Sequence, residues 1–140
     1  MIPQYTTAAL VTENKTLCFP ASADSVPTSL GQEDHVSMGS ISGRKLHLVI
    51  DNLEYIQAIE LLYASQALEF RRPLQSAPVI EACHQLVRQH VPAISDDRVF
   101  ADDINQLHQL ITSGLLLQTA EESAILNQIN LHNDEEFSIF

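Results

Sequence analysis

The densest group of reactive side chains in this 140-residue sequence spans four consecutive positions. An amide, two carboxylates and an imidazole come together there, on Gln32, Glu33, Asp34 and His35. A carboxylate and an amide at a helix start can bind or deprotonate a polar substrate, so Gln32 and Glu33 are candidate site residues. Helix capping is the alternative: Ser29 followed by Gln32 fits a capping box, and acidic residues favour the positive end of a helix.

The histidines and cysteines do not predict a metal site. His84 and His90 are six residues apart, so they fall on different faces of a helix, whereas zinc sites use close ligand pairs. Cys18 and Cys83 are too few for a disulfide scaffold. We therefore expect no metal ligand and no residue that binds a cofactor within this chain.

Helical periodicity dominates the sequence and predicts an all-α fold, a long central helix with shorter flanking helices. We expect residues 1–140 to form a single segment. Its predicted parts are a helix over 1–14, a candidate active-site loop over 15–35, a long helix over 36–72, two short helices within 77–114 and an acidic tail over 115–140 that includes a weak helix at 121–129. Arg71 and Arg72 suit the negative end of the long helix, and Pro73 stops it. Gly114 is expected to end the last short helix.

The predicted long helix creates a size problem. Over residues 36–72 it would span about 55 Å, whereas a compact chain of this length has a diameter near ~40 Å. Its apolar residues cover much of its circumference, so they need cover from several sides. The sequence therefore predicts a helical oligomer or one part of a larger protein.

The charge balance excludes several classes of partner. Seven Lys and Arg residues against eighteen Asp and Glu residues give a net charge of −11. Nucleic acids and anionic membrane surfaces both attract clustered cations, so neither is an expected partner. No apolar run approaches the ~20 residues of a membrane span, and the N-terminus lacks the pattern of a signal peptide. A cytoplasmic protein is expected.

Several short blocks, taken in order, resemble the C-terminal part of the histidine ammonia-lyases, in the aromatic amino acid lyase family. The blocks are Glu13-Asn14-Lys15, Pro20-Ala21-Ser22, Asp24-Ser25, Pro27-Thr28-Ser29, Gln32-Glu33-Asp34-His35-Val36-Ser37-Met38-Gly39, Arg44-Lys45-Leu46, Ala58-Ile59-Glu60-Leu61-Leu62, Ala64-Ser65-Gln66-Ala67-Leu68-Glu69 and Asp97-Arg98-Val99 followed by Asp102. The resemblance covers roughly residues 1–115, and the block that begins at Gln32 is its most specific part.

This resemblance implies a fumarase/aspartase-like lyase whose long helices form the central bundle of a homotetramer. Such enzymes convert L-histidine to urocanate and ammonia, in active sites built from more than one subunit. The family's active-site glutamate maps onto Glu33, and Gln32 is its neighbour. A carboxylate accepts hydrogen bonds from an imidazole, whereas a phenyl ring has no such donor. The plant phenylalanine lyases have Asn-Gln at these two positions, which fits this difference. A role for Glu33 as a general base remains an alternative.

The chain also departs from the family pattern. The family's electrophile is a methylidene-imidazolone formed from Ala-Ser-Gly, and this sequence contains no such tripeptide. The nearest matches are Ile41-Ser42-Gly43 and Thr112-Ser113-Gly114, and Gly31 stands where the family usually has asparagine.

We therefore expect a C-terminal portion of such a lyase that is inactive alone. Its expected partners are an N-terminal lyase segment and other copies, in a dimer or tetramer. The alternative is a non-catalytic helical oligomerisation module.

Overall fold

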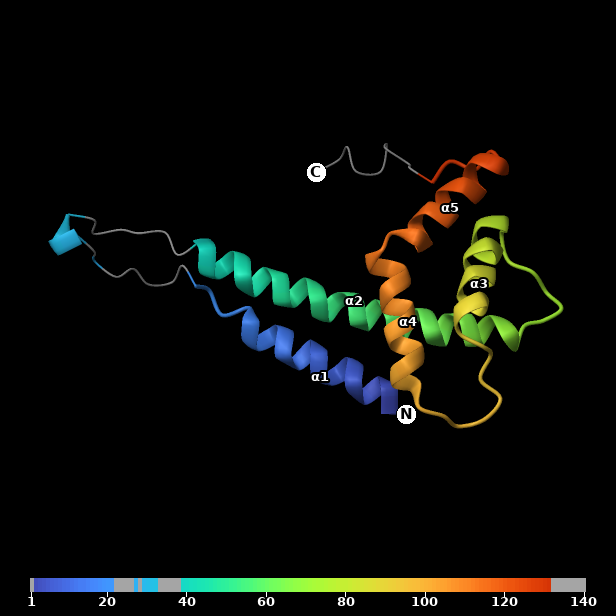
Figure 1. Cartoon of the computed structure of the whole chain (residues 1–140), viewed down its shortest axis with the longest axis horizontal. Helices are drawn as coiled ribbons and strands as arrows, with labels where there is room; N and C mark the ends of the chain where they lie inside the picture. Colours follow the sequence, from blue (N-terminus) through green and yellow to red (C-terminus); the bar gives the residue numbers. More distant parts are fainter. Residues whose placement is uncertain (1, 22–26, 28, 33–38, 132–140) are drawn as a thin grey trace. The chain divides into compact units, whose positions relative to one another are not determined.

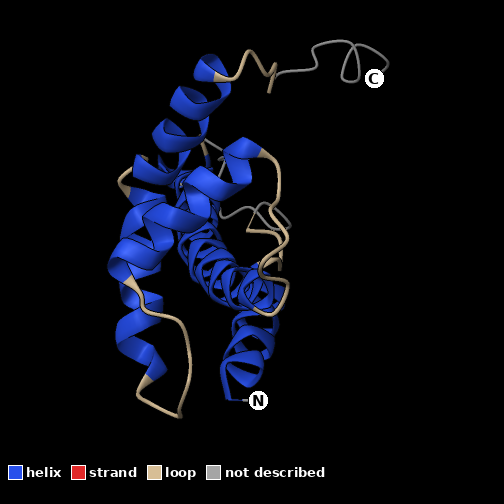
Figure 2. Cartoon of the chain, turned by 90° about the vertical axis from the view of Figure 1, so that its right-hand side faces the viewer, coloured by secondary structure: helices blue, strands red, loops and turns tan. Residues whose placement is uncertain are grey.

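A computed structural model describes residues 2–21, 27, 29–32 and 39–131 (Figure 1). Throughout these residues the regular structure is helical, without a strand (Figure 2). The elements are α1 (Ile2–Leu17), the short 3₁₀ helix η1 (Ser29–Gly31), α2 (Gly39–Glu69), α3 (Pro78–His90), α4 (Phe100–Thr112) and α5 (Leu115–Leu126). The predicted all-α fold is confirmed.

The longest helix is shorter than the sequence suggests. α2 has 31 residues and ends at Glu69, whereas the predicted end was residue 72. The backbone then continues in turns, in which the Arg71 N–H donates to the Leu68 carbonyl at 3.0 Å and the Arg72 N–H to the Glu69 carbonyl at 3.3 Å. The prediction that these arginines lie in the last turn of the helix is therefore wrong. The predicted start at Val36 lies outside the described residues.

The segment after Gly114 differs most from expectation. It was predicted as an acidic tail with a weak helix at 121–129, but α5 begins directly at Leu115. Gly114, at a φ of 77°, turns the chain between α4 and α5 in a conformation that glycine adopts readily. α5 packs mainly on α3, and Ala124 is buried. Its apolar residues are spread around the helix, so the amphipathic pattern that reveals α3 and α4 is weak here.

The chain divides into two compact units, residues 1–56 and 57–140. The second unit contains the last part of α2 together with α3, α4 and α5. These elements share a buried apolar core formed by Ala58, Leu62, Leu86, Val87, Val91, Leu107 and Leu110. This core fixes the positions of the polar side chains that project from α2 and α3.

The first unit contains α1 and the first part of α2, and its helices bury little. Pro3 is the one buried residue of α1, and the buried residues of α2 all lie beyond residue 57. Large apolar side chains are exposed along both helices: Ile2, Tyr5, Val11, Ile41, Leu46, Leu48, Ile50 and Leu53. Even so, none of the helices in the described part of the chain is both long and apolar enough to cross a membrane.

Candidate functional site

Gln32 is the one predicted site residue that the structure describes. It is exposed, and its backbone N–H donates to the Ser29 carbonyl at 3.2 Å, closing the turn of η1. Glu33 lies outside the described residues, as do Asp34 and His35. Of the four residues in the predicted reactive block, the structure therefore describes the first, Gln32.

The turn before Gln32 has an uncommon backbone. Ser29, Leu30 and Gly31 have φ values of 55°, 57° and 84°, so all three are left-handed. This conformation costs a residue such as leucine about 1–2 kcal/mol, whereas glycine adopts it freely and asparagine tolerates it. Backbone strain of this kind clusters at functional sites. The left-handed backbone of Ser29 also shows that the predicted capping box is wrong. An N-cap residue has an extended backbone, and α2 begins only at Gly39.

Polar contacts within the first unit brace the loop that carries Gln32. The Asn52 side-chain amide of α2 donates to Glu13 Oε2 at 3.0 Å and to Asn14 Oδ1 at 2.9 Å, near the end of α1. Lys45 Nζ donates to the Phe19 carbonyl and lies 5.8 Å from the centre of the Phe19 ring. These contacts tie the end of α1 and the first residues of the loop to α2.

Two of the sequence blocks supply these contacts. Glu13 and Asn14 belong to the first block of the resemblance, and Lys45 belongs to the block that opens α2. In the described structure these residues hold the base of the loop. Asn52 was missed, because a single asparagine on a long helix gives no signal in the sequence.

A hollow of about 260 Å³ lies at the base of this loop, within the first unit. Its lining is mostly apolar and includes one charged group, Lys45. The residues around it are Leu17, Cys18, Phe19, Pro20, Ala21, Ser42, Lys45, Leu46 and Val49.

The two tripeptides nearest to Ala-Ser-Gly do not fit the family's prosthetic group. Ser42 and Gly43 lie inside the α-helical backbone of α2. Ser113 follows α4, and its N–H donates to the Gln109 carbonyl at 3.0 Å. Both segments also lack the alanine. The described residues therefore offer no precursor for the methylidene-imidazolone.

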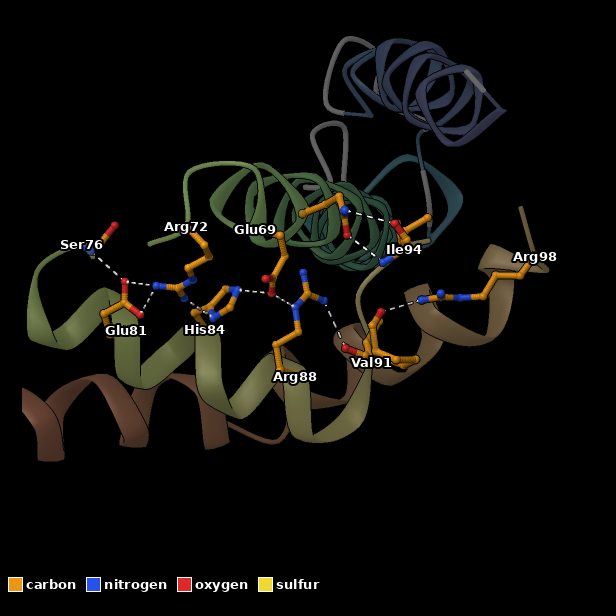
Figure 3. Close-up of polar contacts among 11 residues, drawn as sticks. Glu69, Arg72, Ser76, Glu81, His84, Arg88, Val91, Ile94 and Arg98 are labelled. Carbon is orange, nitrogen blue, oxygen red and sulfur yellow. Dashed lines mark hydrogen bonds and ion pairs between the residues drawn. The ribbon is translucent and has the colours of Figure 1, made fainter. Parts of the chain in front are cut away.

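A polar network joins the end of α2 to α3 in the second unit (Figure 3). At one end, Glu81 accepts from the Ser76 backbone N–H at 2.7 Å and from Arg72 Nη1 at 3.0 and 2.8 Å. The hydrogen bond from Ser76 and the contact with Arg72 lower the pKa of Glu81 below its usual value. Arg72 therefore binds α3 instead of capping α2.

The other end of this network is Glu69, the last residue of α2. Arg88 Nε donates to Glu69 Oε1 at 2.7 Å and lowers the pKa of Glu69. His84 connects the two ends, because Arg72 Nη2 donates to His84 Nδ1 at 3.0 Å (Figure 3). His84 Nε2 lies 3.0 Å from the same Glu69 oxygen, although its N–H does not point along that line.

A second set of contacts fixes the segment between α3 and α4. Arg98 Nε donates to Asp103 Oδ2 at 2.8 Å, and its terminal nitrogens donate to the carbonyls of Pro92, at 2.7 Å, and Ala93, at 3.2 Å. Arg98 belongs to the Asp-Arg-Val block noted in the sequence. These contacts hold the segment between α3 and α4 in place within the second unit.

Within the described residues, no three His, Cys, Asp or Glu side chains gather in a way that could hold a metal ion. His84 takes part in the α2–α3 network, and His90 Nδ1 lies 3.0 Å from the Leu86 carbonyl of its own helix. Cys18 is exposed, whereas Cys83 is half-buried and burial raises its pKa.

The family model described as aromatic amino acid lyase matches residues 1–89, which is more than half of the chain. The chain belongs to the aromatic amino acid lyase family. The match covers the whole first unit and the α2–α3 network of the second.

Histidine ammonia-lyases are among the similar curated members of the family. The enzyme from Natranaerobius thermophilus is 50% identical over 123 residues, which are 88% of this chain and 24% of the relative. The enzyme from Symbiobacterium thermophilum is 50% identical over 124 residues, covering 89% and 24%. The chain thus spans about a quarter of these relatives and matches their C-terminal part.

Solved structures of other aromatic amino acid lyase relatives share the fold. Histidine ammonia-lyase from Trypanosoma cruzi matches with a TM-score of 0.84 and 47% identity, over 88% of this chain and 24% of that one. Tyrosine aminomutase from Streptomyces globisporus matches with a TM-score of 0.81 and 37% identity, over 86% and 23%. Because proteins of different activity share this fold, the fold alone does not select a substrate.

Proposed function

We propose that this chain is the C-terminal portion of a histidine ammonia-lyase-like enzyme, which converts L-histidine to urocanate and ammonia. The observation that carries the proposal is the 50% identity to histidine ammonia-lyases over 88% of the chain. The tyrosine aminomutase is less similar, at 37% identity. This difference favours histidine as the substrate.

In this proposal Glu33 contacts the substrate. An imidazole offers an N–H donor, and a carboxylate accepts from it with charge assistance, which a phenyl ring cannot use. Gln32, the neighbouring amide, helps to hold the substrate. The left-handed turn at Ser29–Gly31 directly precedes Gln32, and Lys45 binds the Phe19 carbonyl just after α1. Proton transfer by Glu33 is the alternative role.

The chain is expected to be inactive alone. Activation of the substrate amine as a leaving group is the chemistry that the family's methylidene-imidazolone supplies. The precursor Ala-Ser-Gly is absent from these 140 residues, so sequence outside them must provide it. The proposed partner is an N-terminal lyase segment, joined by further copies of this chain.

The test mixes this chain with the N-terminal three quarters of a histidine ammonia-lyase and follows urocanate absorbance after histidine is added. The mixture should turn over histidine, and neither piece alone should. Glu33→Gln should slow the mixture at least tenfold, or about 1.4 kcal/mol. The matched control is Glu60→Gln, since Glu60 is exposed on α2 in the second unit. Turnover by this chain unaided, or unchanged kinetics with Glu33→Gln, would contradict the proposal.

A second candidate function is a non-catalytic oligomerisation module. The observation that favours it is the exposed apolar surface of α1 and the first part of α2, where Leu46 and Leu48 are each more than half exposed. Surfaces of this kind mark sites of association. Light scattering of the purified chain should then show a dimer or tetramer, and a compact monomer at micromolar concentration would argue against it. Failure of every N-terminal partner to restore turnover would favour this function over the lyase.

A further inference from the structure

His84 of α3 is held between a base and an acid. Its side chain is 6% exposed, Arg72 Nη2 lies 3.0 Å from its Nδ1, and Glu69 Oε1 lies 3.0 Å from its Nε2. A guanidinium only donates hydrogen bonds and stays charged, so Nδ1 must accept. A neutral ring then carries its proton on Nε2, which lies 3.0 Å from Glu69 Oε1 although its N–H does not point at that oxygen. The contacts therefore select one tautomer.

We propose that His84 is a pH-sensitive switch that holds the 70–77 segment to α3. In the neutral form it accepts from Arg72 and keeps that side chain against α3. A proton on Nδ1 would place two donors against each other at 3.0 Å, so the contact with Arg72 cannot survive protonation. Acid then weakens the attachment of the 70–77 segment, which joins α2 to α3.

The charges around His84 are balanced. Glu69 and Glu81 carry two negative charges, and Arg72 and Arg88 carry two positive charges, so the neutral ring leaves the network without net charge. Protonation adds one charge at a buried position, which is costly unless it is paired. The donor geometry at Nδ1 therefore decides which contacts of a protonated ring survive.

Among the described residues, the other helices that pack on α3 show no hydrogen bond or ion pair to this ring. The charged or titratable groups of α4 and α5 are Asp102, Asp103, His108, Glu121 and Glu122. Asp103 pairs with Arg98, and Glu122 accepts from Gln118. Asp102 and Glu121 are exposed, and His108 is half-buried on α4 with contacts of its own. The response to acid is therefore assigned to the α2–α3 network.

Protonation of His84 should loosen only the 70–77 segment. The residues that follow His84 on α3 include Leu86 and Val87, which are buried in the apolar core and carry no titratable group. The 70–77 segment, by contrast, contains exposed Phe70 and Leu74 and reaches α3 through Arg72 and Ser76. Protonation should raise the frequency of local opening of this segment, while the hydrogen bonds of Glu81 with Arg72 and Ser76 remain and the second unit stays folded.

The test measures amide hydrogen exchange of residues 70–77 at pH 7.5 and pH 5.5, corrected for the intrinsic effect of pH. The two conditions lie on either side of the pKa of free histidine, which is about 6.5. Exchange in the natural chain should be about tenfold faster at pH 5.5, as one charged hydrogen bond is lost. His84→Gln should abolish this difference, because glutamine can accept from Arg72 and cannot titrate.

The matched control is His90→Gln, since His90 lies on the same helix, is exposed and contacts only its own helix in the described structure. This variant should keep the response of the natural chain. Nitrogen NMR of the natural chain at pH 7.5 provides a second measurement and should show Nε2 protonated and Nδ1 free. Protonated Nδ1 at pH 7.5, no difference between the two pH values, or an equal difference in His84→Gln would each overturn the proposal. If His84→Gln fails to fold, the NMR result on the natural chain decides.

Discussion

The side chain of Gln66 forms two reciprocal hydrogen bonds with the backbone of Ile94. Gln66 Oε1 accepts from the Ile94 N–H at 2.8 Å, and Gln66 Nε2 donates to the Ile94 carbonyl at 3.2 Å. These bonds join α2 to the segment between α3 and α4, across 28 residues of sequence. Ile94 also packs against the apolar core, so the pair holds this segment by polar and apolar contacts together.

Gln66→Ala should destabilise the second unit by about 1–3 kcal/mol, because both backbone groups of Ile94 lose their partner at a half-buried position. Urea unfolding followed by circular dichroism measures the change. Gln89→Ala is the control, since Gln89 is exposed on α3 and its loss should cost less than about 0.5 kcal/mol. Equal stability of the two variants would show that the Gln66 pair contributes nothing.

Leu62→Ala should destabilise the chain by about 2–5 kcal/mol, because Leu62 is 1% exposed in the core of the second unit. Leu48→Ala, on the same helix, should change unfolding in dilute solution by less than about 0.5 kcal/mol, because Leu48 is 52% exposed. Thermal unfolding of both variants tests the contrast. A large loss with Leu48→Ala in a monomeric sample would mean that the first unit buries this side chain.

Acid should weaken the link between α2 and α3 through Glu81 and Glu69. The pKa of each is lowered in the folded chain, by Ser76 and Arg72 at Glu81 and by Arg88 at Glu69. A lowered pKa adds stability above the ordinary carboxyl pKa of about 4.3, and this stability is lost as the pH falls through the lower folded value. Urea unfolding at pH 7 and pH 3 should therefore show a smaller acid effect in Glu81→Gln than in the natural chain. An acid effect as large in Glu81→Gln as in Glu60→Gln would refute this role for Glu81.

The two cysteines should react at different rates. Cys18 is exposed, whereas Cys83 is half-buried with a raised pKa, so less of its reactive thiolate forms at neutral pH. Cys83→Ser should therefore keep the fast phase of labelling by a thiol reagent, and Cys18→Ser should lose it. In urea the two variants should react alike. A faster native reaction at Cys83 would contradict the burial seen in the structure.

The helical class and the places where several helices stop can be predicted from the order of residues alone. Apolar residues at helical spacing predict α3 and α4. The two helices end close to Pro92 and Gly114, because proline disrupts a helix and glycine readily adopts the backbone conformation that ends one. The short blocks around Glu13 and Lys45 were also recognisable from the sequence, and the family match confirms the resemblance. These features depend on neighbours in the chain, so they can be read from the order of residues.

The roles of the isolated polar residues depend instead on the three-dimensional fold. Arg72 follows the end of α2 and binds Glu81 and His84 of α3, and Gln66 binds Ile94, which is 28 residues away in the sequence. α5 likewise depends on packing against α3, because its apolar residues follow no single face. The free energy in these cases comes from partners far away in the sequence. A local sequence pattern cannot predict such partners, because they come together only when the core of the second unit forms.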